Sequence, residues 1–140
     1  MFWELLDEHE KALVLLKILT HLAKVDGQLN EKEFAYLAHV CEKLKVSIEE
    51  IRHAVLSTEE LNEILPSDEQ DRMMVLYHLL FMMDADKIVD EKEEKMIYHY
   101  GLKLGFSEYM VRDFIDVFKK YDLDDLPPNA MLSIIQKYQN

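Results

Sequence analysis

The sequence predicts an all-α fold, a single-domain bundle of about seven to eight helices built from two pseudo-symmetric three-helix repeats. Three observations predict this fold. Residues 24–53 and 84–113 align at a constant offset of 60 positions without a gap. The composition is 49% apolar with only three Gly and three Pro, which favours helix over sheet. Apolar residues also recur at helical spacing along both copies.

The repeated segments keep nine identical positions. These are Asp26/Asp86, Glu31/Glu91, Lys32/Lys92, Glu33/Glu93, His39/His99, Lys43/Lys103, Leu44/Leu104, Ser47/Ser107 and Arg52/Arg112. A repeat of this length is typical of one supersecondary unit used twice. We therefore expect one domain over residues 1–140, with repeat 1 at about 11–56, repeat 2 at about 71–121 and a C-terminal helix at about 129–138.

Each repeat is expected to contain three helices. They are predicted near Lys11–Lys24, Glu31–Leu44 and Ile48–Leu56 in copy one, and near Asp71–Met83, Glu91–Leu104 and Glu108–Tyr121 in copy two. The first helix of each copy is apolar on nearly every side, so both should lie centrally in the core. On the second helix of copy one, apolar residues at i, i+3, i+4 and i+7 predict one buried stripe. The stripe consists of Phe34, Leu37, Ala38, Cys41 and Leu44.

The helix starts carry capping signals. A cap residue is followed three positions later by Glu in the pairs Asn30/Glu33, Asp90/Glu93 and Ser47/Glu50. These pairs predict capping boxes, in which each side chain bonds the other residue's backbone amide. Ser107 takes the equivalent cap position in copy two, but Met110 cannot return the bond, so only half of a box is expected there. Before the first helix, an amphipathic segment carries Phe2, Trp3, Leu5 and Leu6.

The charge and the cysteine content narrow the function. A formal net charge of −12 argues against nucleic acid and anionic lipid, whose binding draws on clusters of Lys and Arg. Basic partners or cations suit the chain better. The single Cys41 forms no internal disulfide and no secretory leader pattern precedes the domain, so we expect a cytoplasmic protein. The apolar run Met73–Met83 is too short for direct membrane insertion, which needs about 20 apolar residues.

The two acidic loops are the candidate metal-binding feature. The segment Asp26–Glu33 matches the second half of an EF-hand loop, with Gly27 at the position of the sharp turn. The match fails at the front, because Leu22 and Lys24 occupy the first two ligand positions. Copy two departs further, with Lys87 in place of the glycine. The candidate ligands for Ca²⁺ or Mg²⁺ are Asp26, Glu33, Asp86, Asp90 and Glu93.

A structural interpretation explains the same loop residues and is preferred. Asn30 and Asp90 would cap the following helices, while Glu33 and Glu93 would close the capping boxes. Under this interpretation the chain needs no cofactor, whereas under the other it binds Ca²⁺ or Mg²⁺.

Other residues favour packing over chemistry. His39 and His99 lie away from the apolar stripes and are expected to face water. Cys41 and its counterpart Gly101 are expected to be small residues that permit close helix contact. The eight methionines lie mostly in apolar helices, which favours core packing over a binding groove. The sequence has no phosphate loop, nucleophile elbow, paired CxxC or zinc-protease motif, so we expect no enzyme and no catalytic residues.

The segments LAKVDGQLNEKEFAYLAHVCEKL and MMDADKIVDEKEEKMIYHYGLKL resemble the tellurite-resistance TerB family and the related N-terminal domain of DjlA-type membrane co-chaperones. The resemblance covers about residues 11–121 and departs from the family pattern at Lys87. The matching residues are Val25, Asp26, Gly27, Leu29, Asn30 and Glu33. The resemblance implies a cytoplasmic all-helical domain of two similar halves, without known enzymatic activity, linked to tellurite or other chemical stress. It also implies metal contacts at acidic loop residues, here Asp26, Glu33, Asp86, Asp90 and Glu93.

Three functional hypotheses follow in order of preference. The first is a non-catalytic TerB-like module with a protein-interaction or scaffold role in a tellurite or chemical stress response, with partners in a membrane-associated stress complex. The alternative is a divalent-cation sensor or buffer that uses the two acidic loops. The third is an enzyme whose site lies between the halves and uses His39, His99 or nearby carboxylates.

Overall fold

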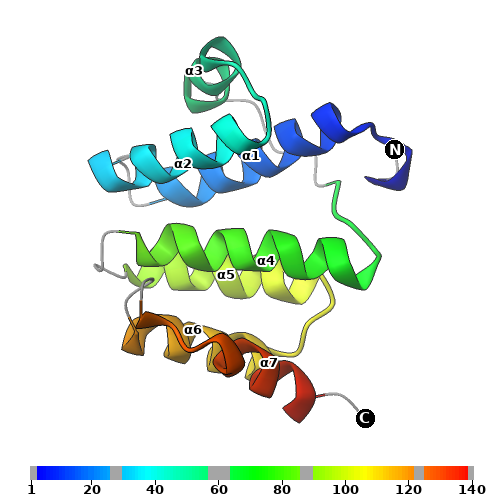
Figure 1. Ribbon diagram of the computed structural model, residues 1–140, viewed down its shortest axis with the longest axis vertical. Helices are drawn as coiled ribbons and strands as arrows, with labels where there is room; N and C mark the ends of the chain where they lie inside the picture. Colours follow the sequence, from blue (N-terminus) through cyan, green and yellow to red (C-terminus); the bar gives the residue numbers. More distant parts are fainter. Residues whose placement is uncertain (1–2, 26–29, 57–63, 86–89, 122–124, 139–140) are drawn as a thin grey trace.

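The structure is a computed structural model that describes residues 3–25, 30–56, 64–85, 90–121 and 125–138, the side chain of Pro128 excepted. Within these ranges every regular element is helical and there is no strand (Figure 1). The elements are η1 (Trp3–Leu5), α1 (Glu8–Lys24), α2 (Glu31–Lys43), α3 (Ile48–Leu56), α4 (Glu69–Asp84), α5 (Glu91–Lys103), α6 (Glu108–Lys120) and α7 (Pro128–Lys137). The predicted all-α fold class is confirmed.

The helices are stacked in pairs along the long axis of the molecule (Figure 1). Helices α1 and α2 pack together, and α4 and α5 form the next pair, with α1 lying against both α4 and α5. Helix α3 covers the outer side of α1. At the opposite end, α6 packs on α4 and α5, and α7 packs on α6.

Helices α1 and α4 form the centre of the core, as predicted. Their inward side chains are fully buried, among them Leu19 and Leu22 on α1 and Leu76, Leu79 and Leu80 on α4. Burying one such side chain contributes about 1.5–3 kcal/mol relative to leaving it in water. One hydrophobic cluster joins buried residues from all seven α-helices. None of the helices in the described ranges is long and apolar enough to cross a membrane.

The predicted stripe on α2 is partly wrong. Leu37 and Cys41 are buried, but Phe34 is 50% exposed, whereas its neighbour Glu33 is only 1% exposed. Because one residue turns a helix by about 100°, the inward face runs through Glu33, Leu37, Val40 and Cys41 and turns Phe34 toward solvent. The Glu33 side chain can occupy this face because it bends back to the start of its own helix, where it accepts a hydrogen bond from the Asn30 amide.

Caps explain where α1 and α4 begin. Helix α1 starts three residues before the predicted position, because Asp7 caps it and forms a capping box with Glu10. Helix α4 starts two residues early, because Asp68 Oδ1 accepts a hydrogen bond 2.9 Å long from the Asp71 amide. The sequence prediction overlooked both caps, although the pattern Asp-x-x-Glu at residues 7–10 was visible.

The caps of the third helices match their predictions. Ser47 and Glu50 form a box at the start of α3, with the Glu50 amide 3.1 Å from Ser47 Oγ and the Ser47 amide 3.1 Å from Glu50 Oε1. At the start of α6, Ser107 Oγ accepts a hydrogen bond 3.2 Å long from the Met110 amide. Because the methionine has no carboxylate to return the bond, only half of the box forms, as predicted.

Gly101 permits the close packing of α5 on α6. A Cβ atom at this position would lie 2.6 Å from Cγ2 of Val111, which is itself fully buried. The predicted role of a small residue at this position is confirmed.

Candidate functional site

The first acidic loop ends in the predicted capping box. Asn30 Oδ1 accepts a hydrogen bond 2.8 Å long from the Glu33 amide, and Glu33 Oε1 accepts one of 3.3 Å from the Asn30 amide. These two contacts satisfy two of the amides that a helix start leaves without intrahelical partners. The structural interpretation of Asn30 and Glu33 is therefore confirmed.

The second acidic loop ends differently. Asp90 Oδ1 accepts a hydrogen bond 2.7 Å long from the Lys92 amide, one position before the amide that a capping box uses. The predicted Asp90/Glu93 box thus gives way to a shorter turn at the start of α5. Glu93 is buried at 2% exposure, as is Asp84 at the end of α4. The sequence prediction did not foresee the burial of these carboxylates.

The predicted metal ligands are only partly placed. Asp26 and Asp86 lie outside the described residues, while Glu33, Asp90 and Glu93 occupy the first turns of α2 and α5 or the positions before them. Within the described ranges, no three His, Cys, Asp or Glu side chains come together in a group that could hold a metal ion. The cation hypothesis therefore depends on the loop residues beyond these ranges and stays a prediction.

Two other predicted features occupy the expected environments. His39 and His99 are both exposed, as predicted. Cys41 is buried at 1% exposure. Burial, together with the nearby negative charge of Glu50, raises the pKa of the Cys41 thiol to about 11. Because the thiolate is the reactive form, this thiol is inert near neutral pH.

Two histidine–tyrosine contacts, which the sequence prediction missed, link the helices of residues 8–43 to those of residues 69–103. His21 Nδ1 on α1 lies 3.0 Å from the hydroxyl of Tyr100 on α5. Tyr36 on α2 places its hydroxyl 3.0 Å from Nδ1 of His78 on α4. Burial lowers the pKa of His78 and raises the pKa of Tyr36, so both groups are neutral at pH 7.

His78 makes stability depend on pH. Burial holds the pKa of His78 in the folded protein below its ordinary value of 6.5. Between these two pKa values the unfolded chain therefore binds more protons than the folded chain. We expect the contribution of His78 to the free energy of unfolding to be fully present above about pH 6.5 and to fall as pH decreases toward the folded-state pKa. Urea unfolding between about pH 5 and 8 measures this slope.

A matched pair of variants isolates the His78 contribution. His78→Gln should flatten the dependence of the free energy of unfolding on pH relative to the wild type, and His39→Gln, at an exposed histidine, is the matched control. An identical slope in the wild type and His78→Gln would contradict the assignment.

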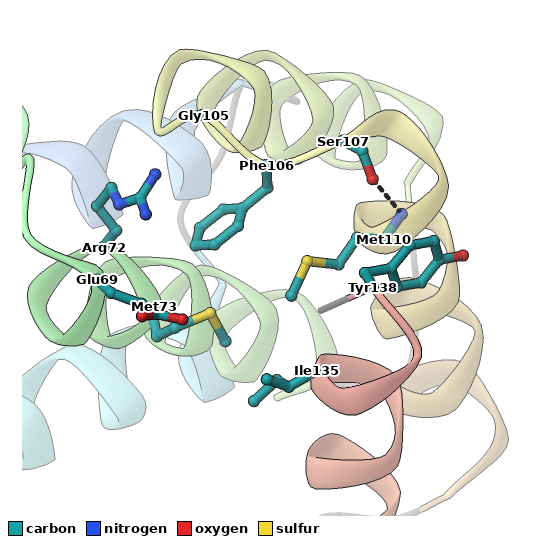
Figure 2. Close-up of a pocket in the computed structure, with 9 residues that line it drawn as sticks. All are labelled: Glu69, Arg72, Met73, Gly105, Phe106, Ser107, Met110, Ile135 and Tyr138. Carbon is teal, nitrogen blue, oxygen red and sulfur yellow. Dashed lines mark hydrogen bonds between the residues drawn. The ribbon is translucent and has the colours of Figure 1, made fainter. Parts of the chain in front are cut away.

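A pocket of about 370 Å³ opens beside α4, at the end of the molecule that carries α6 and α7 (Figure 2). Four parts of the chain form it: the start of α4, the turn between α5 and α6, the first turn of α6 and the end of α7. The described lining residues are Glu69, Arg72, Met73, Gly105, Phe106, Ser107, Met110, Ile135 and Tyr138. Its volume lies at the small end of the range of about 300–1,000 Å³ that is usual for ligand sites.

Arg72 is the cation of this pocket and is firmly held. Its Nη1 donates a hydrogen bond 2.8 Å long to the carbonyl oxygen of Leu104, at the end of α5. The guanidinium carbon lies 5.3 Å from the centre of the Phe106 ring, a cation–π distance. Gly105 makes room for this arrangement, because its φ is +94° and a Cβ atom there would lie 2.8 Å from Nη1.

A polar clasp fixes the wall that α7 contributes. Asp113 Oδ2 on α6 accepts hydrogen bonds from the Tyr138 hydroxyl at 2.6 Å and from Lys137 Nζ at 3.1 Å. These contacts, with the Tyr138 bond first, hold the pKa of Asp113 below its usual value. Asp113 is therefore ionised at neutral pH and attaches the last turn of α7 to α6.

The corresponding place sixty residues earlier carries a polar contact. There His9 Nε2 lies 2.7 Å from Glu50 Oε2 and joins α1 to α3. Hydrogen bonds from Ser47, followed by the contact with His9, lower the pKa of Glu50, so its carboxylate stays charged. At the same offset the pocket has Glu69 and Met110, a pair that cannot form such a bond.

Comparisons of the chain with models of protein families, with curated proteins and with solved structures find no match. The TerB resemblance therefore rests on the two loop segments and stays a prediction. What the pocket binds has to be inferred from its own chemistry.

Proposed function

We propose that the chain is a non-catalytic helical module that recruits a protein partner through the pocket beside α4. The pocket itself is the observation that carries this proposal. Met73, Phe106, Met110 and Ile135 provide apolar walls, and one cation, Arg72, lies among them. Methionine side chains adapt to the shape of an occupant, which suits recognition of a peptide segment.

The chemistry of the lining supports binding over catalysis. The nine described lining residues include no His, Cys or Lys. The Ser107 hydroxyl caps α6, and the Tyr138 hydroxyl is bonded to Asp113. A nucleophile needs a general base within hydrogen-bond reach, and these lining groups offer no such pair.

The proposal includes an origin by duplication of one three-helix unit. Two pairs of helix starts support it. Helices α2 and α5 have 13 residues each and begin at Glu31 and Glu91, and α3 and α6 begin at Ile48 and Glu108. The intervals between these starts equal the 60-residue offset of the sequence repeat. On this basis α7 is an addition outside the repeat, and the pocket is formed by the second copy together with α7.

The TerB resemblance supplies the proposed setting, a tellurite or chemical stress response in the cytoplasm. The partner would then belong to a membrane-associated stress complex. Cation binding through Asp26, Asp86 and the neighbouring carboxylates stays the alternative function.

Capture with a filled pocket tests the proposed function. Met73→Trp places a larger side chain in the pocket, and Leu13→Trp makes the same change sixty residues earlier, at a similarly half-buried position of α1. We expect wild type and Leu13→Trp to capture the same proteins from native lysate, and Met73→Trp to recover them about ten-fold less, a loss of about 1.4 kcal/mol in binding.

Two checks make this capture experiment decisive. Circular dichroism must give the same helix content for all three proteins, and each captured protein must be purified and titrated directly. Equal capture and equal affinity for Met73→Trp and wild type would contradict the proposal.

A further inference from the structure

We propose that the pocket recognises the carboxyl-terminal apolar residue of its partner, with Arg72 holding the terminal carboxylate and the apolar walls holding the last side chain. This inference rests on the proposed function and specifies the partner's chemistry. Three observations carry it: the state of the Arg72 guanidinium, the distribution of polar and apolar walls, and the contrast with the equivalent place in the first copy.

Arg72 has no carboxylate within ion-pair distance in the described part of the chain, although the protein carries 28 acidic residues. Nearby cations behave differently, since Arg112 and Lys137 both pair with Asp113. The Arg72 Nε atom is buried and makes no hydrogen bond to any described residue. A buried donor left in this state is costly, so an acceptor supplied by a ligand would be bound favourably.

The geometry of the guanidinium favours a carboxylate as that acceptor. Nη1 is already engaged with the carbonyl of Leu104, and the ring of Phe106 lies at the guanidinium. Nη2 makes no hydrogen bond to a described residue, and a ligand that also accepts a hydrogen bond from the buried Nε must displace the side chains that cover it. Two parallel N–H groups on one edge match the two oxygens of a carboxylate, and the fixed orientation lowers the entropy lost on binding.

The apolar walls explain why a chain terminus is preferred to an Asp or Glu side chain. Met73 and Phe106 lie next to Arg72, while Met110 and Ile135 line the rest of the space (Figure 2). An occupant of this pocket must therefore present a carboxylate and an apolar group close together. Within a protein, the last residue of the chain does so when its side chain is apolar. A volume of about 370 Å³ suits one or two residues better than a whole helix.

The first copy has a different set of residues at the equivalent positions. Arg72 corresponds to Ala12, and Met110 corresponds to Glu50, which there contacts His9. The cation and the apolar space thus occur together in the second copy. Glu69, exposed at the rim, opposes an anionic ligand and should weaken its binding.

Peptides with and without a free carboxylate test the inference. The probes are N-acetylated tetrapeptides that end in Leu, Ile, Phe or Val, each as the free acid and as the amide, titrated by calorimetry and by NMR on the wild-type protein. We expect at least one free acid to bind and its amide to bind at least ten-fold more weakly. Shifts should map to Gly105, Ser107 and Ile135. Failure of every free acid to bind at millimolar concentration, or equal affinity for acid and amide, would overturn the inference.

Variants connect the carboxylate to Arg72. Arg72→Gln should abolish the difference between acid and amide, and Arg72→Lys should reduce it, because lysine keeps the charge without the two-pronged edge. Glu69→Gln should tighten binding of the acid, whereas Arg52→Gln, at an exposed arginine of α3, should have no effect. If the Arg72→Gln variant does not fold, the Arg72→Lys variant and the wild-type titration still test whether Arg72 binds the carboxylate. A preserved preference for the acid in Arg72→Lys, with unchanged affinity, would overturn the assignment.

One further probe separates a protein terminus from a small metabolite. N-acetyl-leucine carries the same carboxylate and side chain without the preceding residues. Binding as tight as that of the tetrapeptide would overturn recognition of a protein terminus in favour of a small apolar acid. A captured partner that depends on the pocket but binds equally well after its C-terminal residue is deleted would overturn this inference and leave the proposed function standing.

Discussion

Replacing Phe118 by Ala is expected to lower the free energy of unfolding by about 3–5 kcal/mol. The side chain is fully buried on α6, and its ring lies 5.1 Å from that of Phe81 on α4 in an edge-to-face arrangement. Truncation removes this contact and leaves a cavity that close-packed neighbours fill only partly. Urea unfolding monitored by circular dichroism measures the loss.

Phe34→Ala is the matched control for this prediction. The sequence pattern placed Phe34 in the buried stripe, but its side chain is 50% exposed. The same truncation at this position should change stability by only about 0.5 kcal/mol. Equal losses for the two variants would mean that the inward face of α2 is the one predicted from apolar spacing and not the one that carries Glu33.

Replacing Trp3 by Ala should also cost about 3–5 kcal/mol, although the residue lies close to the start of the chain. Trp3 is 1% exposed, and its Nε1 donates a hydrogen bond 3.0 Å long to Asp71 Oδ2 on α4. Lys11 Nζ lies 5.8 Å from the ring centre. The indole therefore connects η1, α1 and α4. Unfolding followed by circular dichroism measures the loss, because the variant has no tryptophan fluorescence.

Trp3→Phe separates packing from hydrogen bonding at this position. Phenylalanine keeps much of the buried ring but leaves the Asp71 carboxylate without its indole partner, at an expected cost of about 1–3 kcal/mol. A Trp3→Ala variant as stable as the wild type would show that the N-terminal segment is not docked on α4.

The helices could be predicted closely because their signals are local. Apolar spacing and cap residues placed both ends of α3 correctly, and those of α2 and α5 to within one residue. The error on α2 arose where a side chain forms a hydrogen bond with the backbone at the start of its own helix. Spacing alone assigns an apolar residue such as Phe34 to the core, but the hydrogen bond that turns Glu33 back toward Asn30 lets a carboxylate take that place.

The pocket could not be predicted for a different reason. Its walls come from positions as far apart as Glu69 and Tyr138, and they meet only because α6 and α7 fold back beside α4. In the sequence, nothing distinguishes Arg72 from other charged residues near helix starts. Met110 stands out only because it cannot complete a capping box with Ser107. A comparison of the two repeats could have pointed to the pocket, because the second repeat has Arg72 where the first has Ala12.

The contacts between Asp113 and the last turn of α7 couple two equilibria, the docking of α7 on α6 and the binding of a ligand in the pocket. Ile135 and Tyr138 belong to α7 and also line the pocket, so a molecule seated there rests partly on a helix that must itself be docked. By thermodynamic linkage, if docked α7 strengthens ligand binding, the bound ligand stabilises the docking of α7 on α6 by the same free energy. Occupancy would therefore slow amide exchange in the terminal turn, and loosening the terminal turn would weaken occupancy.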